Sequence, residues 1–139
     1  MMNISPDFSQ PRQEGHVHAG LGKRILIVDD HETVLLYLTD RLERLGFVVS
    51  TATNGQEGMR LLQEQVFHGV LLDLEMSVMD GLTMLSHLQK QANDIPVIVM
   101  SADPTRTAMI KAIEAGARDY LTKPISNVIL KYKCLRLFA

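Results

Sequence analysis

Acidic, hydroxyl and amino side chains follow short apolar runs at several places in the sequence. These residues are Asp29, Asp30, Asp73, Ser101 and Lys123. Uninterrupted aliphatic runs are typical of strands that are buried on both faces of a parallel sheet. Because the carboxyl ends of parallel strands meet at one edge of a sheet, we expect these five side chains to converge there.

Three carboxylates at one edge need a compensating positive charge. At a separation of about 5 Å and an effective dielectric constant near 20, each pair would repel by about 3 kcal/mol, and Lys123 offsets only one charge. A site of carboxylates, carbonyls and water suits Mg²⁺. A hydroxyl and an ammonium group can bind phosphate oxygens, and a carboxylate can act as a nucleophile. The residues therefore favour a magnesium site that holds an aspartyl phosphate.

Apolar runs alternate with helical patterns from residue 23 onward. The expected strands cover residues 25–28, 47–52, 70–73, 95–101 and 118–123, and the expected helices cover residues 34–45, 54–65, 80–88, 103–116 and 126–139. The expected helix caps are Asp30, Asn54 and Asp103, and Asp80 is expected to begin the third helix. Five alternations predict an α/β fold with a single doubly wound, five-stranded parallel sheet flanked by five helices.

The composition is that of one globular domain. The 139 residues are 46% hydrophobic and 22% charged, and a formal net charge of -2 gives no sign of nucleic-acid binding. Residues 1–22 lack an apolar period and predict a flexible N-terminal arm, which leaves one domain over residues 23–139. One cysteine, no apolar run of membrane-spanning length and no signal-peptide pattern predict a cytoplasmic protein.

Four segments resemble the signature segments of the response-regulator receiver domain of two-component signalling. They read "ILIVDD", "LLDLEMSVMDG", "VIVMSA" and "YLTKP", and their order and intervals are similar to those of the family. The resemblance extends from residue 24 to about residue 138. It implies the flavodoxin-like strand order 2-1-3-4-5. It also implies a phosphorylation-dependent signalling switch that catalyses only its own phosphorylation and dephosphorylation.

The resemblance implies a role for each acidic residue. Asp73 matches the phosphoacceptor, which takes a phosphoryl group from a sensor histidine kinase or a phosphotransfer protein. Asp30, Asp73 and the main-chain carbonyl of Glu75 would hold Mg²⁺, and Asp29 would act largely through a metal-bound water. The family commonly has proline where this chain has Ser77. The absence of proline should slightly loosen the loop that follows Asp73.

The resemblance also implies how the switch works. Ser101 matches the switch hydroxyl, and Lys123 matches the lysine that pairs with the carboxylate and then with the phosphoryl group. The Lys123–Pro124 bond resembles a cis peptide of the family. Tyr120 matches an aromatic residue that rotates inward when Ser101 moves toward the phosphoryl oxygens. The readout would be the face of the fourth helix, fifth strand and fifth helix, where a homodimer or an output domain would bind.

The roles of some residues near the site stay open. Met76, Val78 and Met79 either pack on the domain or form a docking surface for a kinase helix. His31 is expected to be solvated at a helix start, although a histidine beside this site could modulate phosphoryl transfer.

The last helix carries two apolar stripes. One stripe comprises Ile125, Val128, Ile129 and Tyr132, and the other comprises Leu130, Cys134 and Leu137. A helix that covers a sheet needs only one such stripe. The extra stripe indicates contact with a second copy, with a partner or with a following domain, if the natural chain continues past Ala139.

Two other functions fit parts of the pattern. A phosphatase or phosphotransferase of the haloacid dehalogenase type also forms an aspartyl phosphate. That family, however, places its acids as Asp-x-Asp after the first strand, whereas Asp29 and Asp30 are adjacent and Asp73 follows the third strand. An interaction module that has lost phosphorylation would have no need of the intact acidic residues, Ser101 and Lys123.

Overall fold

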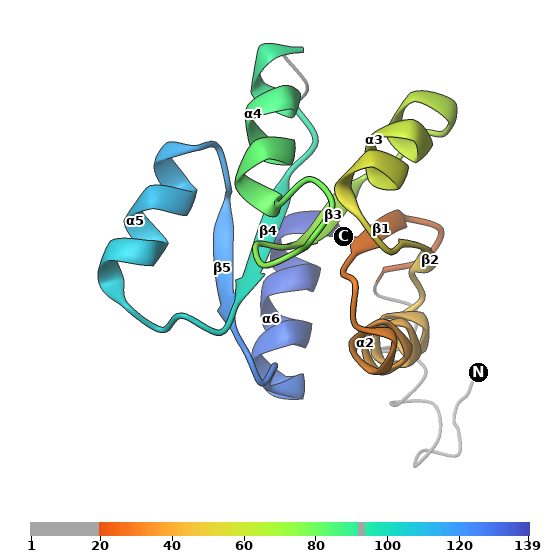
Figure 1. The fold of residues 1–139 in the computed structure, drawn as a ribbon. Coiled ribbons are helices and arrows are strands. Elements are labelled where there is room, and N and C mark those ends of the chain that lie inside the picture. Colours follow the sequence, from red (N-terminus) through yellow and green to blue (C-terminus); the bar gives the residue numbers. More distant parts are fainter. Residues whose placement is uncertain (1–19, 92–93) are drawn as a thin grey trace, which may run out of the picture.

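The computed structural model describes residues 20–91 and 94–139, over which five strands alternate with five helices (Figure 1). The strands are β1 (Arg24–Val28), β2 (Val48–Ala52), β3 (Gly69–Asp73), β4 (Val97–Ser101) and β5 (Asp119–Thr122). The helices are α2 (Glu32–Arg44), α3 (Gly55–Glu64), α4 (Gly81–Lys90), α5 (Arg106–Glu114) and α6 (Asn127–Phe138). Of the predicted arm, residues 1–19 lie outside the described part.

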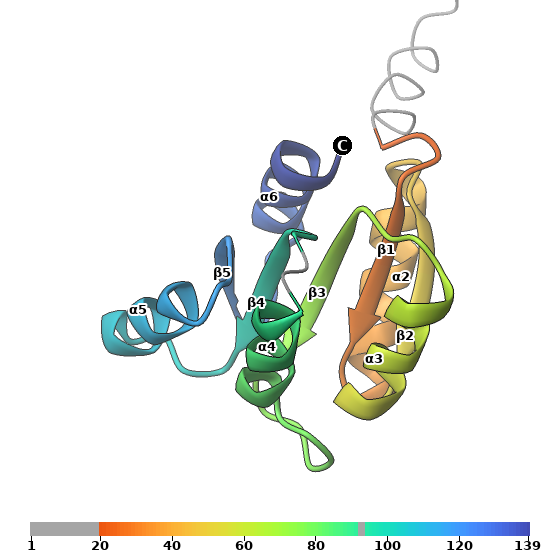
Figure 2. The ribbon, with the colours of Figure 1, turned by 90° about the horizontal axis from the view of Figure 1, so that it is seen from above.

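All five strands form one parallel sheet in the order β2-β1-β3-β4-β5. Helices α2 and α6 cover one face, while α3, α4 and α5 contribute to the core on the other face (Figure 2). The predicted fold class and strand order are therefore confirmed. Right-handed crossovers between parallel strands place the helices on both faces in this way.

The central strands are apolar because both of their faces are covered. Strands β3 and β4 are buried along their whole length, and β1 is buried except at its first residue. Alternate residues of β1 serve opposite cores: Leu26 and Val28 join the α3–α5 side, whereas Ile25 and Ile27 join the α2–α6 side. The edge strand β2 is mostly exposed or half-buried. A sheet with two covered faces thus needs the continuous aliphatic runs seen in the sequence.

One of the three predicted helix caps, Asn54, is confirmed, and Asp80 caps the helix that it is expected to begin. The Asn54 side chain accepts a hydrogen bond from the Glu57 amide, and the Asp80 side chain accepts one from the Thr83 amide. Each bond satisfies one of the free amides in a first helical turn. The side chain of Asp80 thereby fixes the start of α4 directly after the loop that follows Asp73.

The other two cap predictions are wrong. Helix α2 begins after His31, whose side chain caps no amide, and Asp30 instead accepts a hydrogen bond from the Ser77 amide. Helix α5 is capped by Thr105, whereas Asp103 accepts from the Thr105 amide in the preceding turn. In both cases the carboxylate satisfies a loop amide rather than a helix end.

Helix α6 buries one of its two apolar stripes. Leu130 and Cys134 are buried against the sheet together with Phe138, which the predicted stripe did not include, and Leu137 is half-buried. In the other stripe Val128, Ile129 and Tyr132 are exposed and Ile125 is half-buried. Burial raises the pKa of the Cys134 thiol to about 12. The sheet-facing side is thus the one that contains Leu130 and Cys134, and the extra stripe is the one that contains Val128 and Tyr132.

Candidate functional site

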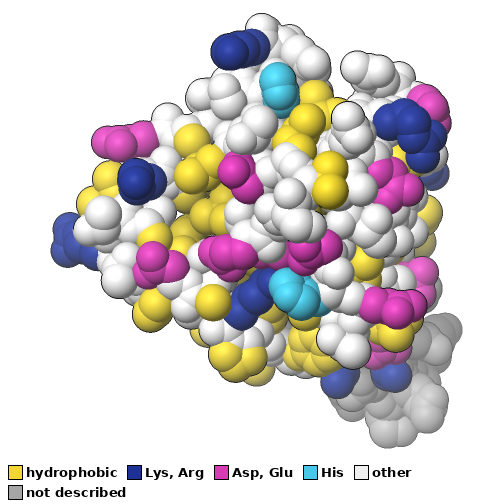
Figure 3. Space-filling view, viewed as in Figure 1, with side chains coloured by type: hydrophobic (Ala, Val, Ile, Leu, Met, Phe, Trp, Pro, Cys, Tyr) yellow, Lys and Arg dark blue, Asp and Glu magenta, His cyan; other side chains and the backbone are white. Residues whose placement is uncertain are grey.

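The five predicted side chains all lie at the carboxyl ends of the strands. Asp29 and Asp30 follow β1, Asp73 and Ser101 are the last residues of β3 and β4, and Lys123 follows β5. Figure 3 shows a row of acidic side chains across the middle of this face, with a basic and a histidine side chain beside it. The distances that follow confirm the predicted convergence for Asp29, Asp30, Asp73 and Lys123, and Ser101 lies at the same end of the neighbouring strand.

Asp29 and Asp73 are two buried carboxylates that share one ammonium group. Both side chains have no exposed surface, and Lys123 Nζ lies 3.0 Å from Asp29 Oδ2 and 3.3 Å from Asp73 Oδ1. The His31 amide donates to Asp29 Oδ1, and the Glu75 amide donates to Asp73 Oδ1. Asp73 Oδ2 is buried and has no hydrogen-bond partner.

The pKa values reflect this crowding. Burial and then the charge of Asp29 raise the pKa of Asp73 from 3.8 to about 6, although the Glu75 amide and Lys123 act in the opposite direction. Burial lowers the pKa of Lys123, but its hydrogen bonds and charge interactions with Asp29 and Asp73 outweigh that effect and leave the pKa raised. Lys123 therefore stays charged, while Asp73 is the carboxylate that gains from added positive charge.

The ligand atoms needed for a cation are present in this cluster. Asp29, Asp30, His31 and Asp73 each offer one atom within 4.8 Å of the others. The buried Asp73 Oδ2 has no hydrogen-bond partner and lies 3.8 Å from His31 Nδ1. A cation would satisfy this oxygen, since an incompletely paired buried charge is costly. A set dominated by carboxylate oxygens fits the predicted Mg²⁺, which prefers oxygen ligands.

His31 takes part in the cluster, in addition to lying at a helix start. Its side chain is 58% exposed, and Nδ1 lies 2.9 Å from Asp29 Oδ1 and 3.2 Å from Asp30 Oδ1. The hydrogen bond with Asp29 raises the pKa of His31. The signal in the sequence was its position directly after two carboxylates, where the turn folds its ring back onto them.

Glu75 connects the loop after β3 to the end of β4. The Ser101 hydroxyl donates a short hydrogen bond to Glu75 Oε2, and the Ala102 amide donates to Glu75 Oε1 at 3.2 Å. The sequence pointed to the main-chain carbonyl of Glu75 and gave no sign of this side-chain contact. Both oxygens of an acidic side chain thus engage the predicted switch residue and its neighbour.

Tyr120 is turned inward in this structure. Its side chain is 4% exposed, and its hydroxyl donates to the Asp103 carbonyl at 2.6 Å. The Lys123–Pro124 bond is cis, as expected. The aromatic ring therefore lies behind the loop that begins with Ser101.

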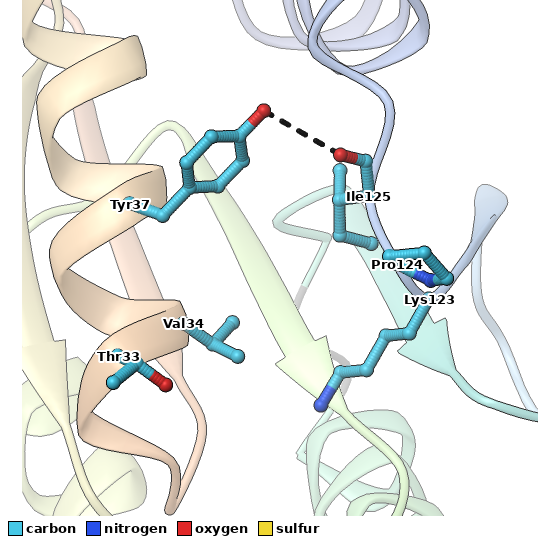
Figure 4. Close-up of a pocket in the computed structure, with 6 residues that line it drawn as sticks. All are labelled: Thr33, Val34, Tyr37, Lys123, Pro124 and Ile125. Atoms are coloured by element: carbon cyan, nitrogen blue, oxygen red, sulfur yellow. Dashed lines mark hydrogen bonds between the residues drawn. The ribbon is translucent and has the colours of Figure 1, made fainter.

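An apolar groove runs beside Lys123 (Figure 4). It has a volume of about 410 Å³ and is lined by Thr33, Val34, Tyr37, Lys123, Pro124 and Ile125. Tyr37 and Val34 project from α2 toward Ile125 on the opposite wall, where the Tyr37 hydroxyl donates to the Ile125 carbonyl at 3.5 Å. One of its lining residues, Lys123, carries the ammonium group that pairs with Asp29 and Asp73.

The exposed loop after Asp73 is partly packed. Met76 is buried against the core that includes α4, whereas Val78 is exposed. Met79 is half-buried, packs against the same core and has a φ of 53°. Packing therefore explains Met76 and Met79, and Val78 is the residue of this group that a partner could contact.

None of the described helices has the length and apolar character to span a membrane.

Comparisons with known sequences point to one family. A family model for the response regulator receiver domain matches residues 25–133. The transcriptional regulatory protein PrrA of Mycobacterium tuberculosis is 38% identical over 114 residues, which cover 81% of this chain and 49% of PrrA. The transcriptional regulatory protein SrrA of Staphylococcus aureus is 36% identical over 117 residues, which cover 83% of this chain and 48% of SrrA. The chain spans about half the length of the curated relatives it matches.

Solved structures agree with this result. The receiver domain of the Francisella response regulator 1452 superposes with a TM-score of 0.81 at 28% identity, covering 84% of this chain and 97% of that one. A CheY-like receiver domain protein from Methanospirillum hungatei gives a TM-score of 0.77 at 28% identity, covering 83% and 92%.

The family model spans both acidic strand ends and the strand that leads to Lys123, so it includes the whole candidate site. Its match, the relatives and the strand order agree with one another, and they disagree with the haloacid dehalogenase alternative. The chain belongs to the receiver domain family of two-component response regulators.

Proposed function

We propose that Asp73 accepts a phosphoryl group from the phosphohistidine of a sensor histidine kinase or a phosphotransfer protein. The observation that carries the proposal is the buried Asp73 carboxylate, which lies 3.3 Å from Lys123 and has one oxygen without a hydrogen-bond partner. A buried carboxylate that is incompletely paired lowers the stability of the fold, so its presence supports a functional role for this residue.

In the proposed reaction, a carboxylate oxygen of Asp73 attacks phosphorus. A P–O bond forms and the P–N bond of the phosphohistidine breaks, so that the imidazole nitrogen keeps the electron pair. Lys123 lies close enough to both buried carboxylates to balance charge on the phosphoryl oxygens. Slow attack by water on the same phosphorus would break the P–O bond to Asp73, release inorganic phosphate and return the free carboxylate.

The acidic cluster supplies the cation site of this proposal. Asp29, Asp30 and Asp73, with the main-chain carbonyl of Glu75, would hold Mg²⁺. When bound, the ion supplies positive charge that the phosphoryl oxygens need during transfer. His31 would position Asp29 through the hydrogen bond between its ring and the carboxylate.

The groove beside Lys123 is suited to the phosphodonor protein. Its walls are mainly apolar, and they include Lys123, whose ammonium group pairs with Asp73. An apolar helix face seated against Val34 and Pro124 would bring a histidine toward the carboxylates. Exposed Val78 lies in the loop on the other side of Asp73 and would complete this contact.

The readout face of the proposal comprises α5, β5 and α6, which are the fourth helix, fifth strand and fifth helix of the fold. Met109, Ile110 and Ile113 of α5 are exposed on this face. We assign the receiver domain to residues 23–139 and expect it to control an output domain, a partner or a second copy of itself. PrrA and SrrA are named transcriptional regulatory proteins. Residues 23–139 would not themselves bind DNA.

The proposal is tested with acetyl phosphate as a small-molecule phosphodonor. The wild-type protein should gain the mass of one phosphoryl group in the presence of Mg²⁺, because the site supplies both nucleophile and charge. Asp73→Asn should gain none, and chelation of Mg²⁺ should prevent labelling of the wild type. Intact-mass spectrometry measures the outcome.

Asp40→Asn is the matched control, since Asp40 is an exposed aspartate on α2 that pairs with Arg44. It should be labelled like the wild type. Labelling of Asp73→Asn at the wild-type rate would contradict the proposal, as would labelling that continues without a divalent cation.

A further inference from the structure

The Glu75 carboxylate is held by the two donors at the end of β4. One oxygen accepts from the Ser101 hydroxyl and the other accepts from the Ala102 amide. A phosphoryl group on Asp73 would present the same chemistry to Ser101, namely negatively charged oxygens that accept hydrogen bonds. Without a phosphoryl group on Asp73, the Glu75 carboxylate supplies the acceptor oxygens for Ser101 and Ala102.

A series of hydrogen bonds continues from this contact to Tyr120. The Ser101 hydroxyl oxygen accepts from the Asp103 amide at 3.0 Å, and the Asp103 carbonyl accepts from the Tyr120 hydroxyl at 2.6 Å. Tyr120 is correspondingly buried. The position of Glu75 and the inward position of the ring thus belong to one connected arrangement.

Glu75 is also tied to Asp73 by the main chain. Its amide donates to Asp73 Oδ1 at 3.1 Å, while its side chain crosses to the other loop. The residue itself is exposed, so its charge stays hydrated and the contact involves little desolvation cost. A group in this position can leave without opening the core.

We propose that Glu75 is an internal substitute for the phosphoryl group, which holds Ser101, Ala102 and Tyr120 in the engaged arrangement before Asp73 is phosphorylated. This inference rests on the proposed function of Asp73 as the phosphoacceptor. Phosphorylation would then replace one acceptor by another at Ser101 and Ala102, and Glu75 would turn outward because two negative groups repel at this distance.

The inference is tested first without phosphorylation, by NMR on the protein over its full length. In Glu75→Ala, hydrogen exchange of the Ala102 amide should become about tenfold faster or more, since a hydrogen bond to a charged acceptor is lost. The ring signals of Tyr120 should shift in the same variant. Glu64→Ala, which removes an exposed glutamate from α3, should change neither signal.

A second arm adds beryllofluoride, a phosphoryl analogue that binds at the aspartate. In Glu75→Ala it should restore slow exchange at Ala102 and the wild-type signals of Tyr120. Glu75→Gln, which keeps one acceptor oxygen without the charge, should lie between the wild type and Glu75→Ala. Unchanged Ala102 exchange and unchanged Tyr120 signals in Glu75→Ala would overturn the inference, and so would failure of bound beryllofluoride to restore them.

The two proposals fail in different ways. If Asp73 is not the phosphoacceptor, beryllofluoride leaves the wild-type spectrum unchanged and Asp73→Asn is labelled by acetyl phosphate. If only the role of Glu75 is wrong, labelling follows Asp73 as expected while Ala102 and Tyr120 ignore the Glu75→Ala change.

Discussion

Asp73 and Asp29 are buried carboxylates, and Lys123 is the ammonium group that lies within 3.3 Å of both. The raised pKa of Asp73, about 6, means that this group is harder to ionise in the folded protein than in the unfolded chain. For an acid with a raised pKa, ionisation destabilises the fold, so stability falls as the pH rises from about 4 through 6. In the metal-free protein, the residue best suited to chemistry therefore weakens the structure.

Replacement of this carboxylate should stabilise the metal-free protein. We expect Asp73→Asn to raise the free energy of unfolding by about 1 to 3 kcal/mol at pH 7, from a shift of about two pKa units and the 1.36 kcal/mol that each unit represents. The gain should shrink as the pH falls from about 6 to 4 and reach zero only at about pH 3 and below, where Asp73 is protonated in both the folded and the unfolded state. Urea unfolding in the presence of a chelator measures it. A gain that is equal at pH 4 and pH 7 would show that the charge of Asp73 is not its source.

Individual site residues could be predicted to different extents. Asp29, Asp73 and Ser101 could be predicted as site residues from the sequence because each lies at the end of a buried strand. The carboxyl ends of parallel strands lie at the same edge of the sheet. The contacts of Glu75 and His31 could not be predicted, because they depend on how loop side chains turn. The rotamer of Glu75 is decided by Ser101 and Ala102, which are far away in the sequence. That of His31 is decided by the turn that places its ring beside its neighbours Asp29 and Asp30.

At the scale of elements, the start of α4 packs against the end of β3, where Asp73 lies. Gly81 is the first residue of α4, and a Cβ atom there would lie 2.5 Å from the Asp73 carbonyl oxygen and 2.7 Å from Leu74 Cα. Both are main-chain atoms, which cannot yield as a flexible side chain can. The helix approaches the site so closely only because this residue has no side chain.

A methyl group at this position should therefore affect both stability and chemistry. We expect Gly81→Ala to lower the free energy of unfolding by about 1 to 3 kcal/mol, because close packing is disturbed. Phosphorylation by acetyl phosphate should also slow, because the Asp73 main chain must shift. Ser86→Ala, at an exposed position of the same helix, is the control and should be close to neutral. Equal behaviour of the two variants would refute this account of Gly81.

Elements were predicted more reliably than their ends. The alternation of apolar runs and helical patterns is repeated five times, so the order of strands and helices followed from it. The caps at Asp30 and Asp103 were misplaced because a carboxylate near a helix start can satisfy a loop amide equally well. Only the geometry of each turn decides between the two.

At the scale of the whole molecule, cation binding should be linked to folding. A cation that binds the native acidic cluster and not the unfolded chain stabilises the fold by mass action. We expect Mg²⁺ at ten times its dissociation constant to add about 1.4 kcal/mol to the free energy of unfolding. Urea unfolding with and without MgCl₂, at constant ionic strength set with NaCl, measures this effect.

Variants separate this linkage from general salt effects. Asp30→Asn should lose most of the magnesium-dependent gain, because a predicted ligand is removed from the cluster. Asp40→Asn, on the exposed surface of α2, should keep it. A gain that survives Asp30→Asn and Asp73→Asn alike would place the cation elsewhere.

The burial of Cys134 has a practical consequence for labelling studies. Its thiol lies inside the α2–α6 core and has a pKa of about 12, so thiolate-directed dyes at neutral pH find almost no reactive form while the protein stays folded. A fluorophore could thus be attached through Val66→Cys, at a side chain that is 75% exposed just before β3, without replacement of the native cysteine. Strand β3 separates that position from Asp73 by about 15 Å, so the dye would leave the acidic cluster untouched.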